Sequence, residues 1–389
     1  MTRRVLLVSN GVGEDLIGAG VARGLEAAGV AVTAYPLVGT GAYPPAIPLL
    51  DPRKALPSGG FSLRAGFRNL AADLRAGLLR LWMEQRRTLT RQRGRHDLIV
   101  AVGDIYCLWM SAAAAPGVAF LATADSVHIA RPGIVARWVL RRHARRIFAR
   151  DPETAQTLAA YGLPAVAEGL VTMDQLQPRG ETFGLPPDAQ VVALLPGSRG
   201  DAVTNALLLA RAAEAIAAVR GDVHFIMALA TSIRSSELIG RLLTLDRSSS
   251  SSTGVVLVGQ ARLHLTQAFA DALARATVVI GLAGTANEQA AGLGRPVVAF
   301  PGPGAQFGPS FLAMQHRLLG EALVPTRTWQ DAVRATLRLL GDADERARRG
   351  DVGRARMGPP GGTQRITHAL LEMLERDGRA QLPGRIQKA

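Results

Sequence analysis

The stretch Leu194-Leu195-Pro196-Gly197-Ser198-Arg199-Gly200-Asp201 joins an apolar run to a long segment rich in alanine and leucine. The run at 191–195 has the length and composition of a buried strand, and the segment at 202–219 has those of a helix. The glycines between them allow a sharp turn and a close approach of the backbone to a ligand. Such a strand–turn–helix unit is typical of a parallel α/β sheet, where the turn lies at the carboxyl edge.

The same alternation continues along all 389 residues, which is enough chain for two domains of ordinary size. The predicted strands are 5–8, 31–35, 98–102, 118–122, 146–149, 191–195, 224–229, 255–258, 278–280 and 297–300, and the main predicted helices are 15–28, 67–91, 152–161, 202–219 and 363–376. Pro, Gly and polar residues cluster at 178–187, where the pattern restarts. We therefore predict two doubly wound, Rossmann-like α/β domains, 1–180 and 188–362, facing each other across a cleft. The remainder, 363–389, is a last helix and tail expected to pack back on the first domain.

The composition of the chain excludes several classes of protein and of binding partner. The formal net charge of +14 comes almost wholly from arginine, since the only lysines are Lys54 and Lys388. Aromatic residues make up only 5%, and no recognition-helix, zinc-knuckle or RNP-like motif occurs, so we expect no nucleic acid as a partner. The single cysteine, Cys107, excludes an intrachain disulfide and a cysteine-built zinc site. No signal-peptide pattern and no apolar run of about 18 residues occurs, so the expected localisation is cytoplasmic.

The first glycine-rich turn reads Ser9-Asn10-Gly11-Val12-Gly13-Glu14-Asp15 and opens a helix. Asn10, Gly11 and Gly13 place backbone N–H groups at a helix amino end, which favours anions or hydroxyl-rich ligands. The adjacent carboxylates Glu14 and Asp15 favour sugar hydroxyls or general-base chemistry over a phosphate. The alternative is an ordinary turn in which one carboxylate caps the helix.

The second half carries the more specific pattern. Ser198 and Arg199 follow Gly197 at the end of the strand 191–195, and the arginine fork suits a diphosphate. The strand 278–280 leads to Gly281-Leu282-Ala283-Gly284-Thr285-Ala286-Asn287-Glu288-Gln289, a helix start whose amides can hold a phosphate and whose glutamate can accept both hydroxyls of a ribose. The loop at 301–307 closes on the same edge. The predicted set for a nucleotide diphosphate sugar is Gly197, Ser198, Arg199, Gly259, Gly284, Thr285, Ala286, Glu288 and Gln306. The alternative is three ordinary turns with a solvated glutamate.

With these motifs the sequence resembles the lipid-A-disaccharide synthase-related proteins, which stand near the lipid A disaccharide synthases among the two-domain GT-B glycosyltransferases. The resemblance rests on residues 9–20, 148–176, 194–201 and 284–307, with 357–366 in support. It implies a UDP-sugar donor bound mainly by the C-terminal domain, a lipidic acceptor bound mainly by the N-terminal domain, and transfer with inversion. The first loop and the segments 121–132 and 167–170 depart from the synthases' pattern, so lipid A itself is not predicted as the product.

Carried over by position, Ser198 and Arg199 meet the diphosphate, Gly284 and Thr285 line it, and Glu288 holds the ribose. Asp104, in Val102-Gly103-Asp104, resembles the proposed base of the synthases, and Asp15 and Glu14 are the next candidates for this role. A cap after a strand is the alternative role of Asp104. The acceptor side comprises Asn10, Gly11, Gly13 and Asp125.

We predict a metal-independent hexosyltransferase without a cofactor, because nothing resembles a metal-binding Asp-x-Asp on a loop and the seven histidines show no ligand spacing. His128, near Asp125, is expected to be a packed or surface imidazole. A UDP-sugar epimerase of the same architecture and a non-catalytic nucleotide-sugar-binding relative stay open as alternatives.

Two segments combine arginines with apolar and aromatic residues. Nine arginines lie between Phe61 and Arg95, and seven more between Arg131 and Arg150, around Trp138. Basic amphipathic helices with aromatic anchors lie on anionic bilayers. We expect the protein to associate peripherally with the inner face of the cytoplasmic membrane. Helices with a solvated basic face and a core face are the alternative.

Overall fold

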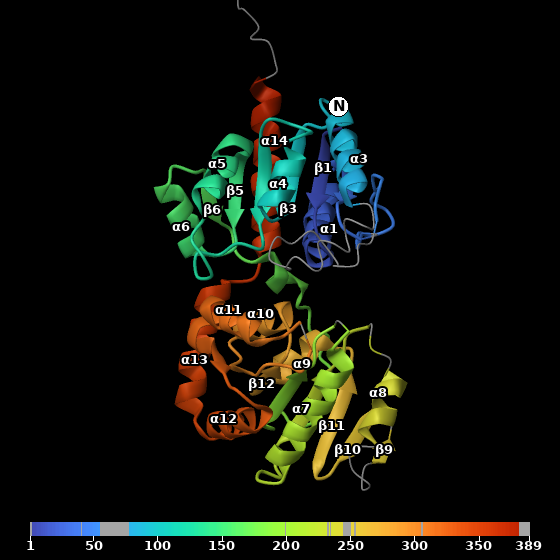
Figure 1. The fold of residues 1–389 in the computed structure, drawn as a ribbon, viewed down its shortest axis with the longest axis vertical. Helices are drawn as coiled ribbons and strands as arrows, with labels where there is room; N and C mark the ends of the chain where they lie inside the picture. Colours follow the sequence, from blue (N-terminus) through green and yellow to red (C-terminus); the bar gives the residue numbers. More distant parts are fainter. Residues whose placement is uncertain are drawn as a thin grey trace, which may run out of the picture. The chain divides into compact units, whose positions relative to one another are not determined.

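The computed structural model describes residues 2–39, 41–54, 78–198, 200–231, 233, 235–243, 250–252, 254–304 and 306–380. The chain divides into two compact units (Figure 1). The first unit is Met1–Val171 together with Pro360–Ala389, and the second unit is Thr172–Pro359.

The chain enters the second unit earlier than the cluster at 178–187 suggests. Val171 is part of the first unit's core, whereas the carbonyl of the next residue, Thr172, accepts a 2.7 Å hydrogen bond from the side chain of Gln289. Further along, the buried carboxylate of Asp271 accepts the backbone N–H groups of residues 179–181 at 2.7–3.1 Å. These bonds fix the connecting segment to the second unit.

The first unit is built on a parallel sheet in the order β2-β1-β3-β4-β5-β6. Its described strands are β1 Arg4–Ser9, β2 Ala31–Pro36, β3 Leu98–Gly103, β4 Val118–Ala122, β5 Ala144–Ala149 and β6 Ala165–Ala167. Its described helices are α1 Val12–Ala27, α3 Leu78–Arg91, α4 Ile105–Ser111, α5 Ile134–His143, α6 Pro152–Ala160 and α14 Gly362–Ala380.

Both faces of this sheet are buried, as the continuous apolar runs require. Along β1, Val5 and Leu7 belong to the core cluster that includes side chains of α1 and α14, while Leu6 and Val8 belong to the cluster on the other face, which includes side chains of α3, α4, α5 and α6. This doubly wound arrangement directs the carboxyl ends of all these strands to one edge, where the turns after β1, β3, β4 and β5 lie.

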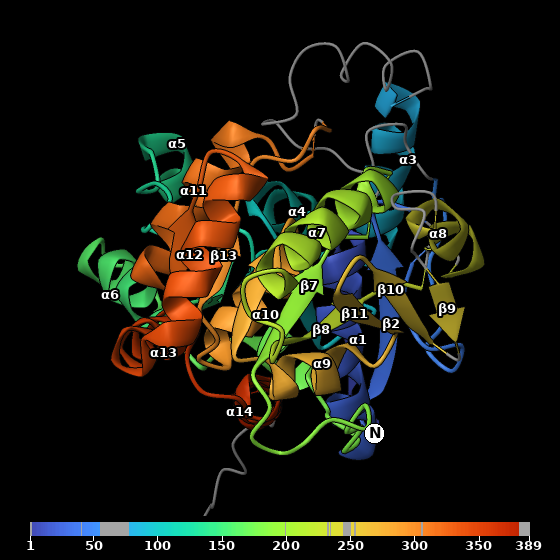
Figure 2. The same ribbon diagram turned by 90° about the horizontal axis from the view of Figure 1, so that it is seen from below.

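The second unit repeats the plan with the order β14-β13-β12-β7-β8-β11-β10-β9. Its described strands are β7 Val191–Leu195, β8 His224–Ala228, β9 Ser250–Ser252, β10 Val255–Val258, β11 Ala261–Thr266, β12 Val278–Gly281, β13 Val297–Ala299 and β14 Leu323–Pro325. Its described helices are α7 Ala202–Ala217, α8 Ser235–Leu242, α9 Phe269–Arg275, α10 Thr285–Gly292, α11 Pro309–Leu319, α12 Trp329–Gly341 and α13 Ala343–Met357, with the 3-10 turn η2 Gly320–Ala322. A further 3-10 turn, η1 Val171–Gln175, spans the boundary between the units. The strands are parallel except at β10, which runs antiparallel to its neighbours β11 and β9. β9 is the edge strand next to β10, as Figure 2 shows.

The predicted strands are confirmed to within a residue at most ends. The strands β6, β9, β11 and β14 were not predicted, and no ranges were predicted for the helices α4, α5, α8, α9, α11, α12 and α13. Of the predicted helix 67–91, residues 67–77 lie outside the described residues. None of the described helices has the length and apolar character needed to cross a bilayer.

Candidate functional site

The turn after β7 lies directly against the turn after β12. Leu282 donates its backbone N–H to the carbonyl of Leu195 at 2.8 Å, and a Cβ added to Gly197 would lie 3.1 Å from the carbonyl oxygen of Leu282. Gly197 also has a φ of +90°, a conformation that favours glycine. Ser198 is exposed beyond this turn, and Arg199 lies outside the described residues.

Two buried side-chain amides fix the start of α10. The Nδ2 of Asn287 donates to the carbonyl of Gly281 at 3.1 Å and to Oε1 of Gln315 at 2.9 Å. The Nε2 of Gln315 in turn donates to the carbonyls of Ala283 and Gly284 at 3.1 and 3.0 Å. The carbonyls before the helix are thereby held by the protein, and the helix amino end keeps one orientation.

The first turn of α10 presents the predicted ligand-binding side chains. Thr285 is exposed, and Ala286 and Glu288 are half-buried. The ring of Phe311 lies 3.5 Å from where a Cβ on Gly284 would be. The amides of this first turn carry the positive end of the helix dipole, which is suited to a phosphate.

The loop after β13 folds onto the start of α7. The backbone N–H of Gln306 donates to Oδ2 of Asp201 at 3.3 Å, and that of Gly302 donates to the carbonyl of Phe307 at 2.9 Å. A Cβ on Gly304 would lie 1.9 Å from the same carboxylate oxygen of Asp201, so a larger residue here would displace that side chain. The turns after β7, β12 and β13 therefore meet at the carboxyl edge of this sheet.

Gly259 is not brought to this edge, which corrects its place in the predicted set. It stands in the hairpin between β10 and β11 with a φ of +56°, and a Cβ there would lie 2.6 Å from the carboxylate of Glu214. Because β11 runs parallel to β8, the turn before β11 lies at the opposite, amino edge. The turn that β11 does bring to the carboxyl edge follows Thr266, whose Oγ1 accepts the N–H of Ala268 at 2.9 Å. Sequence reasoning missed this turn together with its strand.

In the first unit, the predicted base and the first turn are joined by a hydrogen bond. Asn10 donates its Nδ2 to Oδ1 of Asp104 at 2.7 Å, and the backbone N–H of Cys107 donates to the same oxygen at 3.0 Å. Asp104 is thus the N-cap of α4, and its carboxyl group also contacts the end of β1. Burial raises the pKa of Asp104 above its ordinary range, although both hydrogen bonds lower it.

The backbone before Asp104 has a conformation that favours glycine. Gly103 has a φ of +144°, and a Cβ on it would lie 1.9 Å from Oδ1 of Asn10. The close approach of β3 to the first turn is what permits the bond between Asn10 and Asp104.

Asp15 lies inside the first unit with an exposed fraction of only 1%. Its carboxylate accepts the hydroxyl of Ser9 at 2.6 Å and the backbone N–H of Ala42 at 3.1 Å, and Tyr43 donates its hydroxyl to Ser9 at 3.0 Å. Burial raises the pKa of Asp15. This carboxylate holds the segment after β2 against the end of β1, so its contacts are structural.

The other predicted residues of the acceptor side are more accessible. Gly11 is the N-cap of α1 in extended backbone, and Glu14 folds back over it, since a Cβ on Gly11 would lie 2.3 Å from Oε2 of Glu14. A Cβ on the exposed Gly13 would meet no described atom within 4 Å, so no steric requirement for glycine is found there. Asp125 is half-buried on the turn after β4.

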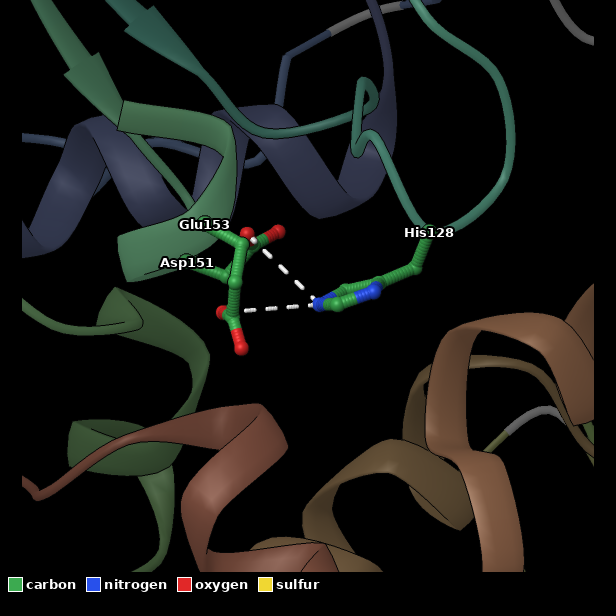
Figure 3. A group of neighbouring side chains, drawn as sticks. All are labelled: His128, Asp151 and Glu153. Carbon is green, nitrogen blue, oxygen red and sulfur yellow. Dashed lines mark ion pairs between the residues drawn. The ribbon is translucent and has the colours of Figure 1, made fainter. Parts of the chain in front are cut away.

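A cluster that sequence reasoning missed lies on the turn after β4 and at the start of α6, the helix that follows β5. His128 Nε2 is 3.5 Å from Oε2 of Glu153 and 3.9 Å from Oδ1 of Asp151 (Figure 3). The sequence could have predicted this cluster, because His128 follows β4 while Asp151 and Glu153 follow the neighbouring strand β5. Residues that follow neighbouring parallel strands lie at the same edge of the sheet.

No protein-family model and no curated protein matches this chain. Solved structures match it over nearly the whole length. A UDP-GlcNAc 2-epimerase from Neisseria meningitidis bound to UDP-GlcNAc shares 14% identity over 95% of this chain and 100% of its own, with a TM-score of 0.55. MurG from Acinetobacter baumannii shares 16% over 95% and 99% with a TM-score of 0.59, and the calicheamicin glycosyltransferase CalG4 shares 15% over 96% and 99% with a TM-score of 0.63.

These matches cover both units, and both units consist of helices alternating with the strands of a parallel-dominant sheet. At such low identities the likeness concerns the fold, so the resemblance to the lipid-A-disaccharide synthase-related proteins is supported at the level of GT-B architecture. The chain has the GT-B fold, an α/β fold of two Rossmann-like domains.

Proposed function

We propose that this protein is a hexosyltransferase that moves a sugar from a UDP-sugar to a lipidic acceptor with inversion at the anomeric carbon. The observation that carries the proposal is the meeting of the turns after β7, β12 and β13 at one sheet edge, next to a fixed helix amino end. Carboxyl edges of this kind are where open α/β sheets bind ligands. The match to a structure of a UDP-GlcNAc-bound enzyme supports a nucleotide sugar as the donor.

The donor is proposed to be held by the second unit. The first-turn amides of α10, with Gly284 and Thr285, face the diphosphate, and Arg199 and Ser198 join them from the turn after β7. Glu288 accepts the ribose hydroxyls. These charge-assisted bonds strengthen as the diphosphate leaves and gains charge, so this site needs no divalent ion and no cofactor.

The first unit is proposed to supply the base. The carboxylate of Asp104 takes the proton of the acceptor hydroxyl while the acceptor oxygen bonds to the anomeric carbon. The bond from that carbon to the diphosphate oxygen breaks, and UDP leaves with the electron pair. A carboxyl group with a pKa above its ordinary range accepts a proton more readily than a solvated one, which supports Asp104 in this role.

A lipidic acceptor is supported by an apolar and basic surface on the first unit. On α5, Val135 and Trp138 are 76% and 60% exposed, next to Ile134 and among several arginines. On α3, Leu79 and Met83 are exposed as well, and both helices pack against α4. We propose that this surface, termed here the α3–α5 surface, contacts an anionic bilayer.

Not every residue of the two basic segments contributes to the α3–α5 surface. Trp82 stacks on Trp109 of α4 with ring centroids 5.9 Å apart, and the guanidinium of Arg86 lies 4.5 Å from the centroid of the Trp109 ring. These two side chains are engaged within the unit. Residues 61–77 of the first basic segment lie outside the described residues.

Ligand-induced stabilisation of the purified chain tests the donor assignment. UDP should raise the melting temperature, with free UMP and other nucleoside diphosphates as comparisons. Arg199→Ala should greatly reduce the shift, whereas Arg262→Ala, an exposed arginine on β11, should leave it unchanged. An unchanged melting temperature of the native chain at millimolar UDP would refute the donor assignment.

The epimerase alternative is supported by the matches to several structures of UDP-GlcNAc 2-epimerases. A UDP-sugar labelled in the sugar separates the two activities. Transfer moves the label to a membrane-lipid extract and releases UDP, while epimerisation isomerises the sugar on UDP without net release. Binding of UDP with neither reaction, across a panel of UDP-sugars and lipid extracts, would identify a non-catalytic nucleotide-sugar-binding protein.

A further inference from the structure

The turn after β4 and the start of α6 place three metal-ligating side chains together in the first unit (Figure 3). Each of His128, Asp151 and Glu153 offers one ligand atom, and these atoms lie within 4.8 Å of one another. The proposed sugar transfer uses none of these residues, and the diphosphate-binding residues belong to the other unit.

The backbone around the cluster is fixed by hydrogen bonds that do not involve the imidazole. Ser126 donates its hydroxyl to Oδ2 of Asp151 at 2.8 Å, and the N–H of Thr154 donates to Oδ1 of Asp151 at 2.7 Å. The N–H of Val127 donates to Oγ1 of Thr154 at 3.0 Å, and the N–H of His128 donates to Oγ of Ser126 at 3.2 Å. The turn after β4 is thereby held against the start of α6, with His128 beside both carboxylates.

The imidazole of His128 has a buried nitrogen, Nε2, that makes no hydrogen bond to any of the described residues and lies 3.5 and 3.9 Å from the carboxylate oxygens of Glu153 and Asp151. Burying a polar atom without a partner is costly, and such an atom in a native structure calls for an explanation. A bound cation facing Glu153 and Asp151 would satisfy this nitrogen.

We infer that His128, Asp151 and Glu153 form a binding site for a divalent transition-metal ion of the zinc type. One imidazole nitrogen and two carboxylate oxygens are a donor set that Zn²⁺ accepts. In a tetrahedral site with bonds of about 2.0–2.2 Å, neighbouring donor atoms stand about 3.4 Å apart. The separations of 3.5 and 3.9 Å from Nε2 to the carboxylate oxygens are close to this value, and the three ligand atoms, which lie within 4.8 Å of one another, would contract around the ion.

Three protein ligands leave the fourth position of such an ion for solvent or for an oxygen of a bound molecule. The ion would link the turn after β4 to α6 and so stabilise the first unit. Oδ1 of Asp151 already accepts the N–H of Thr154, which is the kind of supporting bond that orients a ligating carboxylate.

Calorimetric titration of the tag-free, chelator-treated full chain with ZnCl₂ tests the site. We expect saturable binding of one ion per chain and a raised melting temperature. His128→Ala and Glu153→Gln should each weaken binding by more than the roughly 10–100-fold that loss of an outer-shell partner costs. Glu153 is the safer position, because its side chain is 54% exposed and the amide has the same shape.

The matched control is His368→Ala. His368 Nε2 lies 3.2 Å from Oε1 of Glu372 on the exposed side of α14, so it is a histidine with one described carboxylate partner. This variant should bind zinc like the native chain. With Co²⁺ as the probe, the native chain and the control should show the strong visible absorption of a tetrahedral centre, and the two site variants should not.

Three results would overturn the inference. They are the absence of saturable zinc binding, binding that survives both His128→Ala and Glu153→Gln, and loss of binding in the His368→Ala control. Circular dichroism of each variant shows whether the fold is kept, and Glu153→Gln provides the test if His128→Ala misfolds.

Discussion

The acid–base behaviour of Asp104 follows from the place of its carboxyl group. The group lies at the end of β3, where burial raises its pKa and the bonds from Cys107 N–H and Asn10 lower it by less. Its pKa therefore lies above the ordinary value of about 3.9. A general base works only when deprotonated, so kcat/KM should fall as the pH drops through this raised pKa.

Asp104→Asn tests this role directly. The amide oxygen can still accept the N–H of Cys107, so α4 keeps its cap, but the proton acceptor is lost. We expect turnover to fall by about 10²–10⁴-fold with unchanged affinity for UDP. The acid limb of the pH–rate profile should disappear in the residual activity, while Asp125→Asn should retain that limb. Full turnover in the Asp104 variant would exclude it as the base.

Gly103 is the residue that lets Asn10 reach Asp104. An alanine there would have to adopt a φ of +144° and would place its Cβ 1.9 Å from Oδ1 of Asn10. We expect Gly103→Ala to cost about 1–3 kcal/mol of stability and to lower turnover, because Asn10 must move away from the carboxylate.

Denaturant unfolding and initial rates measure the two effects of Gly103→Ala. Gly94→Ala is the control, since Gly94 has a φ of +70° but a Cβ on it would meet no described atom within 4 Å. That variant should show the conformational cost of about 1–2 kcal/mol with normal turnover. Equal turnover in both variants would contradict the positioning role of Gly103.

At the scale of single elements, the exposed face of α5 allows the sharpest test of a lipidic acceptor. A double change of Val135 and Trp138 to glutamate removes two exposed apolar anchors from a basic helix and adds negative charge. Binding to vesicles of anionic phospholipid at low salt should fall at least about tenfold, because apolar contact and charge attraction are both weakened. Sedimentation across a salt series measures this.

The control for α5 is Val219→Glu, which changes an exposed valine of the second unit, with 67% of its surface accessible. Vesicle binding should be unaffected. If the native chain does not sediment with anionic vesicles at low salt, the α3–α5 surface is a solvated face and the membrane proposal fails.

The strands also show which parts of the fold can be predicted from the sequence alone. Continuous apolar runs such as β7 and β12 were predicted because strands buried on both faces leave that pattern. β11 was not predicted, since its alternation of buried and exposed residues in Ala261–Thr266 resembles no apolar run. Because β11 was missed, the turn after β10 was predicted to lie at the carboxyl edge, and Gly259 was assigned to the site. β10 runs antiparallel to β11, so this turn lies at the amino edge instead.

The features of the candidate site that could not be predicted from the sequence depend on contacts between residues distant in the chain. The order of turns after β7, β12 and β13 predicted a common edge, because it follows from local strand–turn–helix units. The bond from Gln315 to the start of α10 and the burial of Asp15 depend on residues distant in sequence. For the same reason His128 was expected to be a packed or surface imidazole.

At the scale of the whole molecule, the first unit is completed by the end of the chain. After Pro359 the chain returns as α14, whose Ile366 and Leu370 pack in the core with α1. The fit is close, since a Cβ on Gly24 would lie 2.8 Å from Oγ1 of Thr367. The first unit's core therefore depends on a helix made after the entire second unit.

This division predicts that the two units respond separately to damage in their cores. Leu370→Ala removes a fully buried side chain from the first unit, at a cost of about 2–5 kcal/mol. In calorimetry of the full chain it should lower one melting transition by roughly 5–20 °C and leave the UDP-dependent transition in place. Leu340→Ala, at a buried position of α12, should lower the transition that UDP raises. If both variants lower a single transition equally, the units unfold together, and ligand shifts cannot be assigned to either one.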